Sequence, residues 1–186
     1  MVYTELFIEL YNRFIEIVLA PVHNKDMIWI LAPLLATLLL MELYFDRYKG
    51  EELGWNTAFG NSLVLIFVSV DIIKFLHTND MLSYVTIKSA LAIAVILLGL
   101  SLTMLSFFHS LPKGLAFGLT SRLPINLITY LTVVIIYADI IIDVYTAIAS
   151  VLFAVIAGIL LKLISLIVPE SGEIPELENI EEEPKD

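Results

Sequence analysis

The deepest charged residue in an apolar stretch of the chain is Asp71, within SVDIIKFL, and Lys74 follows three residues later. Residues three apart share one face of a helix, so the two side chains can pair within that helix. A charged side chain at the centre of a membrane span costs roughly 3 kcal/mol on insertion scales and usually faces a bundle interior or a water-filled cavity. Asp71 is therefore the first candidate for a carboxylate that binds a proton or a cation. The alternative is an internally neutralised Asp71–Lys74 pair, with Lys74 reaching outward to anchor the helix.

A second pair of acids, Asp139 and Asp143, lies in YADIIIDVYT, and Lys162 is the only other charged residue between residues 124 and 168. A run of this length is too long for one membrane span and must turn near its middle. We expect Asp143 to cap the helix after the turn, its carboxylate accepting backbone N–H bonds. Asp139 is expected one helical turn earlier, ~6 Å deeper along the helix, as a further candidate for proton or cation binding. The alternative for both acids is a solvated hairpin turn.

Recognisable catalytic, cofactor-binding and metal-binding patterns are missing from the sequence. The chain has no cysteine, which excludes disulfides, thiol catalysis and thiolate metal sites. No HExxH or GxSxG motif and no phosphate-binding glycine-rich loop occurs. His23, His77 and His109 lie in three different expected connections and cannot converge on one metal without unusual folding. We therefore predict no enzyme, no cofactor and no metal site; a membrane enzyme that uses scattered acids is the weakest alternative.

The elements that must position these residues are membrane spans. Of the 186 residues, 59% are hydrophobic and 16% are charged, and the mean hydropathy is +0.92. A soluble domain is nearer half apolar and a quarter charged, and here the apolar residues gather in blocks of about 20, the length that crosses a ~30 Å hydrocarbon core. The sequence thus predicts an all-α, polytopic transmembrane helical bundle. Its domain of five expected spans, residues 27–168, comprises residues 27–45, 57–77, 85–108, 124–143 and 146–168.

Residues 1–21 form a separate expected element, an amphipathic helix that ends at Pro21. Its polar residues recur at steps of four, three and four, which places them on one helical stripe: Glu5, Glu9, Asn12 and Glu16. We expect this helix to lie at the membrane interface. The alternative, a sixth span, would carry three glutamates and Arg13 through lipid. Because anionic lipids would repel its acidic face, packing on its own bundle or on a partner is favoured.

The net charge of −10 comes mainly from residues 169–186, which carry eight acids and one lysine. Their Glu- and Pro-rich composition predicts a disordered tail. No basic patch for nucleic acid is present in the rest of the chain. Lys and Arg divide six to four between the two faces of a five-span bundle, which predicts a cytoplasmic tail and an outer position for Asp139 and Asp143. We expect the protein to reside in the cell membrane.

Two functions fit this organisation. In the first, the chain is a non-catalytic subunit of a homo-oligomer or of a larger membrane complex, with the lipid bilayer and other membrane proteins as its partners. In the second, it is a small channel or transporter component in which Asp71, with or without Asp139, handles a proton or a cation. The sequence favours the first slightly, because no broken helix or inverted repeat marks a site at the midplane. A water-filled path reaching Asp71 would favour the second.

Overall fold

The computed structural model describes residues 2–47, 54–82 and 86–167 of the chain. Every regular element in these residues is a helix, so the predicted all-α class is confirmed for the part of the chain that the structure describes. In chain order the elements are α1 (Val2–His23), the 3-10 turn η1 (Lys25–Met27), α2 (Ile28–Arg47), α3 (Trp55–Thr78), α4 (Ile87–Phe107), α5 (Lys113–Leu119), α6 (Arg122–Tyr137) and α7 (Val144–Ser165). The predicted acidic tail, residues 169–186, lies outside the described residues.

Five helical segments are long and apolar enough to cross a membrane, which agrees with the predicted multi-pass organisation. They are Lys25–Arg47, Trp55–Thr78, Ile87–Phe107, Lys113–Tyr137 and Val144–Ser165. The fourth segment differs from the expected span at 124–143. It starts earlier, because residues after Pro112 form the short helix α5, and it ends earlier, because α6 finishes at Tyr137.

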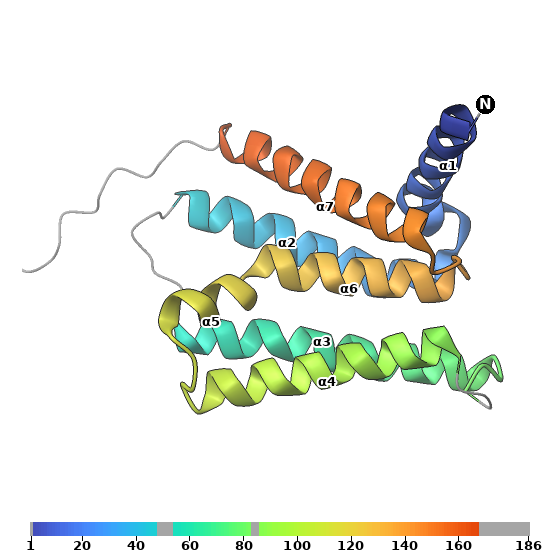
Figure 1. The fold of residues 1–186 in the computed structure, drawn as a ribbon. Coiled ribbons are helices and arrows are strands. Elements are labelled where there is room, and N and C mark those ends of the chain that lie inside the picture. Colours follow the sequence, from blue (N-terminus) through green and yellow to red (C-terminus); the bar gives the residue numbers. More distant parts are fainter. Residues whose placement is uncertain (1, 48–53, 83–85, 168–186) are drawn as a thin grey trace, which may run out of the picture.

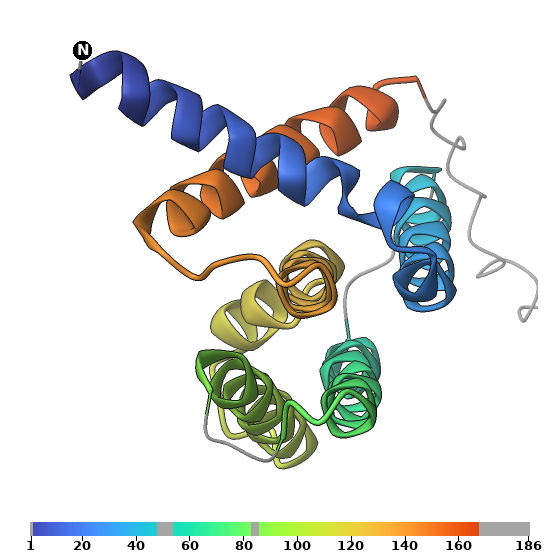
Figure 2. The same cartoon turned by 90° about the vertical axis from the view of Figure 1, so that its right-hand side faces the viewer.

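The five spanning segments run along a roughly common direction, and consecutive ones enter from alternate ends of the bundle (Figure 1). One end, called here the α1 end, holds the starts of α2, α4 and α7 and the C-termini of α3 and α6. The opposite end, called the α5 end, holds α5 and the C-termini of α2, α4 and α7. Helix α1 stands steeply to this direction and packs against α7 and α6. Viewed along the bundle, α2, α3, α4 and α6 are seen nearly end-on, whereas α1 is seen along its length and crosses α7 (Figure 2).

Helix α6 is the centre of the bundle and contacts α1, α2, α3, α4 and α7. Its apolar and hydroxyl side chains point in several directions into the core, which is why it is more fully buried than the other spans. The buried residues of α6 are Ile125, Thr129, Tyr130, Thr132, Val133, Val134, Ile135 and Ile136. Helices α3 and α4 pair closely on one side, where a Cβ added at Gly99 would lie 2.9 Å from the Cβ of Leu65. A glycine at this position therefore lets the two backbones approach.

Asp139 lies outside any helix, which corrects the expectation that it would be one helical turn below Asp143. Its φ of 57° places it in the left-handed region immediately after α6. The amide of Ile140 donates to the carbonyl of Ile135 at 3.0 Å, and the amide of Asp139 donates to the carbonyl of Ile136 at 3.4 Å. This is the bonding pattern of a helix end closed by a left-handed residue, a conformation that aspartate tolerates better than most side chains.

Pro21 does not end α1, which continues to His23 and contains the proline within it. Proline has no N–H, so the carbonyl of Ile17, four residues earlier, loses its usual helical partner. The hydroxyl of Tyr130 on α6 donates to this carbonyl at 3.2 Å, and both Ile17 and Tyr130 are buried. A side chain from another helix thus satisfies the carbonyl that the proline leaves free. This tertiary contact is the physical reason that the local stop signal fails.

Candidate functional site

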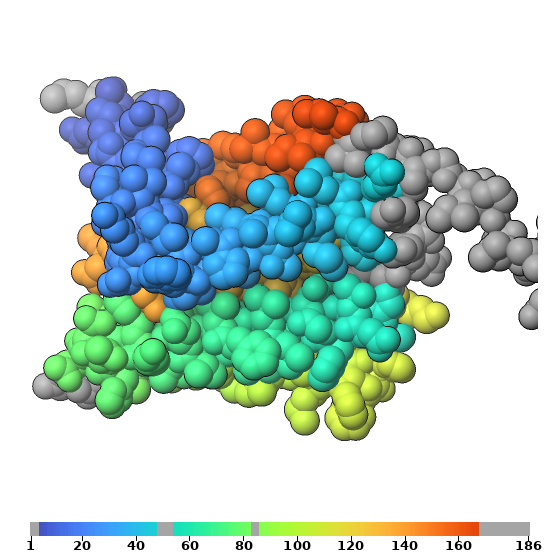
Figure 3. Space-filling model, turned by 180° about the vertical axis from the view of Figure 1, so that it is seen from behind, coloured from blue at the N-terminus to red at the C-terminus, as the bar shows by residue number. Residues whose placement is uncertain are grey.

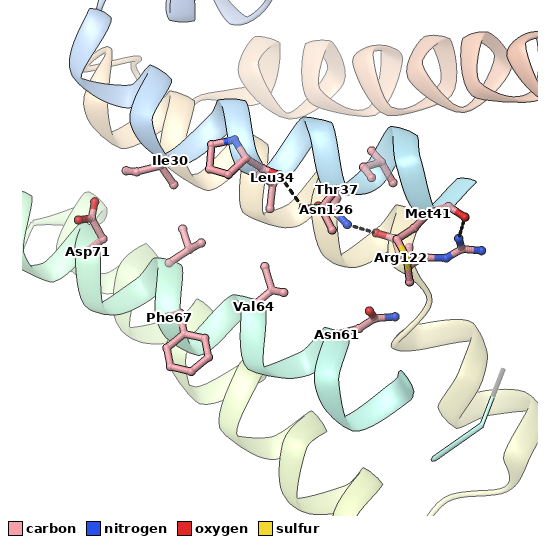
Figure 4. A pocket seen from close by; sticks show the side chains of 13 residues that line it. Ile30, Leu34, Thr37, Met41, Asn61, Val64, Phe67, Asp71, Arg122 and Asn126 are labelled. Carbon is pink, nitrogen blue, oxygen red and sulfur yellow. Dashed lines mark hydrogen bonds between the residues drawn. The ribbon is translucent and has the colours of Figure 1, made fainter. Parts of the chain in front are cut away.

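A groove runs between α2 and α3 with α6 as its floor, and Asp71 lies in it (Figure 4). We call it the α2–α3 groove. Its volume is about 420 Å³, and α2 and α3 both pack against α6 beneath it. Figure 3 shows the face of the molecule on which α2 and α3 run side by side. The groove is lined by Ile30, Pro33, Leu34, Thr37, Leu38, Met41, Asn61, Val64, Phe67, Val68, Asp71, Arg122 and Asn126.

Asp71 is half-buried and lies towards the α1 end of the groove. Its carboxylate accepts a hydrogen bond of 2.5 Å from the hydroxyl of Tyr137, the last residue of α6. The ring of Tyr137 stacks on that of Phe75, with centroids 3.8 Å apart and planes inclined by 18°. The backbone carbonyl of Tyr137 accepts a further bond of 3.0 Å from the amide of Asn24. Tyr137 is therefore held in place and fixes the position of the carboxylate.

The structure does not bring Asp71 and Lys74 together. Lys74 is exposed, and among the ion pairs of the described residues none joins it to Asp71. The two residues share a helical face by spacing, yet the carboxylate is directed to Tyr137 on the neighbouring helix. Within the part of the chain that the structure describes, Asp71 has a hydrogen-bond donor but no cationic partner. The internally neutralised pair is thus absent from this conformation.

Three polar side chains further along the groove donate hydrogen bonds to backbone carbonyls. The amide nitrogen of Asn61 donates to Thr120 at 2.8 Å, and that of Asn126 donates to Arg122 at 2.7 Å. The hydroxyl of Thr37 donates to Pro33 at 2.8 Å. Because a carbonyl can only accept, these bonds fix which atom of each amide is the nitrogen and leave the amide oxygens facing elsewhere. In Figure 4 the Asn61 oxygen lies on the groove side of its amide.

Arg122 occupies the α5 end of the groove, opposite Asp71 (Figure 4). Its guanidinium donates to the backbone carbonyl of Met41 and lies 3.9 Å from the carboxylate of Glu42. The guanidinium carbon also lies 4.0 Å from the ring centroid of Phe45, in cation–π contact. The positive charge of Arg122 is therefore already engaged by α2. From the sequence, Arg122 contributes only to the count of basic residues that predicts topology. Its contacts could not be predicted, because its partner Met41 lies 81 residues away in the chain.

Asp143 caps α7, as predicted, and also binds α1. Its carboxylate accepts from the amide of Thr146 at 2.8 Å, and its other oxygen lies 3.2 Å from the guanidinium of Arg13, which also pairs with Glu16 at 2.7 Å. The backbone hydrogen bond from Thr146 is the main reason that the pKa of Asp143 lies below its usual value, and Arg13 lowers it further. Asp143 is thus a structural anchor between α1 and α7.

Asp139, the other acidic candidate, pairs with Lys88 near the start of α4. It does not line the α2–α3 groove. The side chain of Asp139 is 73% exposed, whereas that of Lys88 is 17% exposed. Of the predicted site residues Asp71, Lys74 and Asp139, only Asp71 lines the groove. The described residues contain no group of three His, Cys, Asp or Glu side chains that could hold a metal ion. The candidate site is consequently a single carboxylate with its tyrosine partner.

Comparison of the chain with models of protein families, with curated proteins and with solved structures finds no match. Function is therefore inferred from the site itself.

Proposed function

We propose that this multi-pass membrane protein is a small channel or transporter component that binds a proton or a cation at Asp71. The observation that carries the proposal is the state of that carboxylate. It lies within a spanning helix, faces the α2–α3 groove, and has no cationic partner among the described residues. A carboxylate inside the hydrocarbon region is costly unless a bound cation or proton compensates its charge, so such a residue is a functional candidate by default.

The groove also supports this proposal over a purely structural one. Asp71 lies seven residues from the end of α3, about 10 Å along the helix, so it is nearer to the α1 end than to the α5 end. Polar side chains continue along the groove at Asn61 and Asn126 towards the α5 end. An open, partly polar path that reaches Asp71 is the feature expected of a component that handles a charged species.

The proposal is tested by flux measurements on the full-length protein in liposomes. A pH-sensitive dye inside the vesicles reports proton movement after an imposed proton, sodium or potassium gradient. We expect flux through the wild-type protein and its loss in Asp71→Asn, because asparagine can accept the Tyr137 bond but cannot hold a proton or neutralise a cation. Asp80→Asn is the matched control, since it removes one acid at the same end of α3, outside the groove lining. Equal flux in wild type and Asp71→Asn would overturn the proposal.

The membrane placement that we propose follows the sequence-based orientation. The α1 end faces outward in the cell membrane and the C-terminal end faces the cytoplasm. Helix α1 lies along the outer interface, which its steep angle to the spanning helices supports (Figure 2). Its contacts with α7 and the Arg13–Asp143 pair provide an attachment to the bundle that does not depend on anionic lipid.

A second candidate function is a non-catalytic subunit of a homo-oligomer or of a larger membrane complex. The observation that favours it is the apolar outer surface of α7, where large side chains are exposed along the whole helix: Val144, Ile148, Val151, Leu152, Val155, Ile159, Leu160 and Leu163. Lipid covers such a face as well as a protein partner does. Native mass spectrometry of the protein released from nanodiscs separates the two, because a subunit of a stable homo-oligomer would appear as a multimer at all concentrations.

A further inference from the structure

The α2–α3 groove presents oxygen acceptors to whatever it binds. One oxygen of Asp71 takes the Tyr137 hydroxyl bond and leaves the other available. The amides of Asn61 and Asn126 direct their nitrogens at backbone carbonyls, which leaves each amide oxygen as an acceptor. The donor of Thr37 is likewise used within its own helix. A ligand that donates hydrogen bonds or carries positive charge is therefore matched to the groove.

The charges at the two ends of the groove favour the same sign of ligand. At the α1 end Asp71 is negative and without a cation, as far as the described residues extend. At the α5 end Arg122 is positive but is engaged by Glu42, by the Met41 carbonyl and by the ring of Phe45. The remaining nitrogen of the guanidinium, Nε, is buried, and an anion at this end would also lie beside the Glu42 carboxylate. A cation at the α1 end instead meets a carboxylate without a cationic partner among the described residues. The electrostatic complement of the groove is a cation.

The spacing of the acceptors does not suit a bare metal cation. Asn61 and Asp71 are ten residues apart on α3, which separates them by about 15 Å along the helix. Hard cations need roughly six or more oxygens at 2.0–2.6 Å around one point. Acceptors spread along a groove instead suit an elongated molecule, or a charge at one end of an apolar body.

The walls of the groove supply the apolar surface for such a body. Most of the side chains that line the groove between Asp71 and Arg122 are aliphatic or aromatic, including Leu34, Leu38, Val64, Phe67 and Val68. A volume of about 420 Å³ lies within the range of small-molecule sites, and one or a few polar groups commonly orient the ligand in such sites.

We infer that the α2–α3 groove binds an organic cation, with its charged group at Asp71 and its apolar body along α2 and α3. This inference rests on the proposed function, in which Asp71 is a cation site, and gives the substrate its chemical class. A molecule of this kind partitions into the membrane and can reach the groove from the lipid side, between α2 and α3.

The test uses two rod-shaped fluorescent probes that differ in the charge at one end. Trimethylammonium-diphenylhexatriene is the cation, and diphenylhexatriene propionic acid is the anion. Each is titrated against the full-length protein in phosphatidylcholine nanodiscs, with empty nanodiscs subtracted and energy transfer from tryptophan as the signal. We expect saturable binding of the cationic rod. Asp71→Asn should weaken it by at least about tenfold, because opposite charges attract far more strongly in protein than in water, and Asp80→Asn should leave it unchanged.

A second variant tests the groove independently of the charge. Thr37 is exposed in the groove wall, so Thr37→Phe should fill the space and weaken binding of the cationic rod while the protein stays folded and its tryptophan donors stay the same. Equal binding of both rods, insensitive to Asp71→Asn, would overturn the inference and indicate a groove that takes an apolar chain. Unchanged binding in Thr37→Phe would overturn it by placing the site elsewhere.

The inference and the proposed function can fail separately. Asp71-dependent proton or metal-ion flux without binding of the cationic rod would overturn the inference and retain the proposed function. Asp71-dependent binding of the rod without any flux would retain the inference and overturn the transport function. Absence of both flux and rod binding in wild-type protein, with a melting temperature that matches that of Asp80→Asn, would overturn both.

Discussion

Tyr137 joins Asp71 to the rest of the molecule. A hydroxyl donor at 2.5 Å stabilises the carboxylate without neutralising it, and the stacked ring of Phe75 prevents the tyrosine from turning away. Lys74, by contrast, is exposed and is free to reach the headgroups. The geometry therefore assigns the stability of this region to the tyrosine and leaves the charge of Asp71 available for a ligand.

This assignment predicts unequal effects of two substitutions. Tyr137→Phe should destabilise the protein by about 1–3 kcal/mol, because it keeps the stacked ring but leaves a half-buried carboxylate without its donor. Lys74→Leu should change stability by less than about 0.5 kcal/mol, as expected for an exposed residue. Both values are measured by equilibrium unfolding in mixed micelles. A larger loss in Lys74→Leu than in Tyr137→Phe would instead support an Asp71–Lys74 pair in the membrane.

Individual residues could be predicted from the sequence more readily than their partners. Asp71 is conspicuous because it is a charge within an apolar run, and the cap at Asp143 follows local rules of helix geometry. Their tertiary partners lie far along the chain, 66 residues away for Tyr137 and 130 residues away for Arg13. No periodicity within one helix carries that information, because it arises only when α6 and α1 pack on their neighbours.

At the scale of helices, length and hydropathy predict the number of spans, but local signals misplace several ends. Pro21 and Asp139 show why. Pro21 is a stop signal that a tyrosine from α6 overrides, and Asp139 is an apparent helix residue that adopts a left-handed conformation. In both cases the deciding contacts or backbone geometry are not encoded in the pattern of polar and apolar residues.

The hydroxyl of Tyr130 bonds the Ile17 carbonyl that Pro21 leaves without a helical donor, so substitutions of Tyr130 and Pro21 should have coupled effects on stability. Tyr130→Phe should cost about 1–3 kcal/mol, because the buried carbonyl of Ile17 then lacks any donor. In a Pro21→Ala background the alanine N–H can bond that carbonyl, so the cost of Tyr130→Phe should fall by about 1 kcal/mol. A double-mutant cycle from equilibrium unfolding measures this coupling. Additive effects would mean that the hydroxyl does not serve the proline-freed carbonyl.

At the scale of the molecule, the bundle places its two kinds of site at different depths. The ion pairs Arg13–Asp143 and Lys88–Asp139 hold the α1 end together, whereas Asp71 lies deeper in the α2–α3 groove. Each of these outer pairs joins two parts of the bundle, because Arg13 lies on α1 and Lys88 on α4 while both aspartates lie between α6 and α7. The deeper carboxylate, Asp71, has no cationic partner among the described residues, whereas Asp143 and Asp139 each have one. This separation is consistent with an outer rim that is structural and a groove that binds a ligand.

The alternation of the spans predicts which parts of the chain share a side of the membrane. The natural sequence has no cysteine, so single cysteines can be introduced without a background. Exposed positions Glu9 on α1 and Asn79 after α3 lie towards the α1 end, and exposed Ser110 after α4 lies at the opposite end. In intact cells, a membrane-impermeant maleimide should label Glu9→Cys and Asn79→Cys but not Ser110→Cys, which should react only after the membrane is opened.

Labelling of Asn79→Cys and Ser110→Cys from one side would refute the alternation of α3 and α4. Labelling of Glu9→Cys from the side of Ser110→Cys would make α1 a sixth span, because α1 could then no longer lie along the outer interface with Arg13 against Asp143.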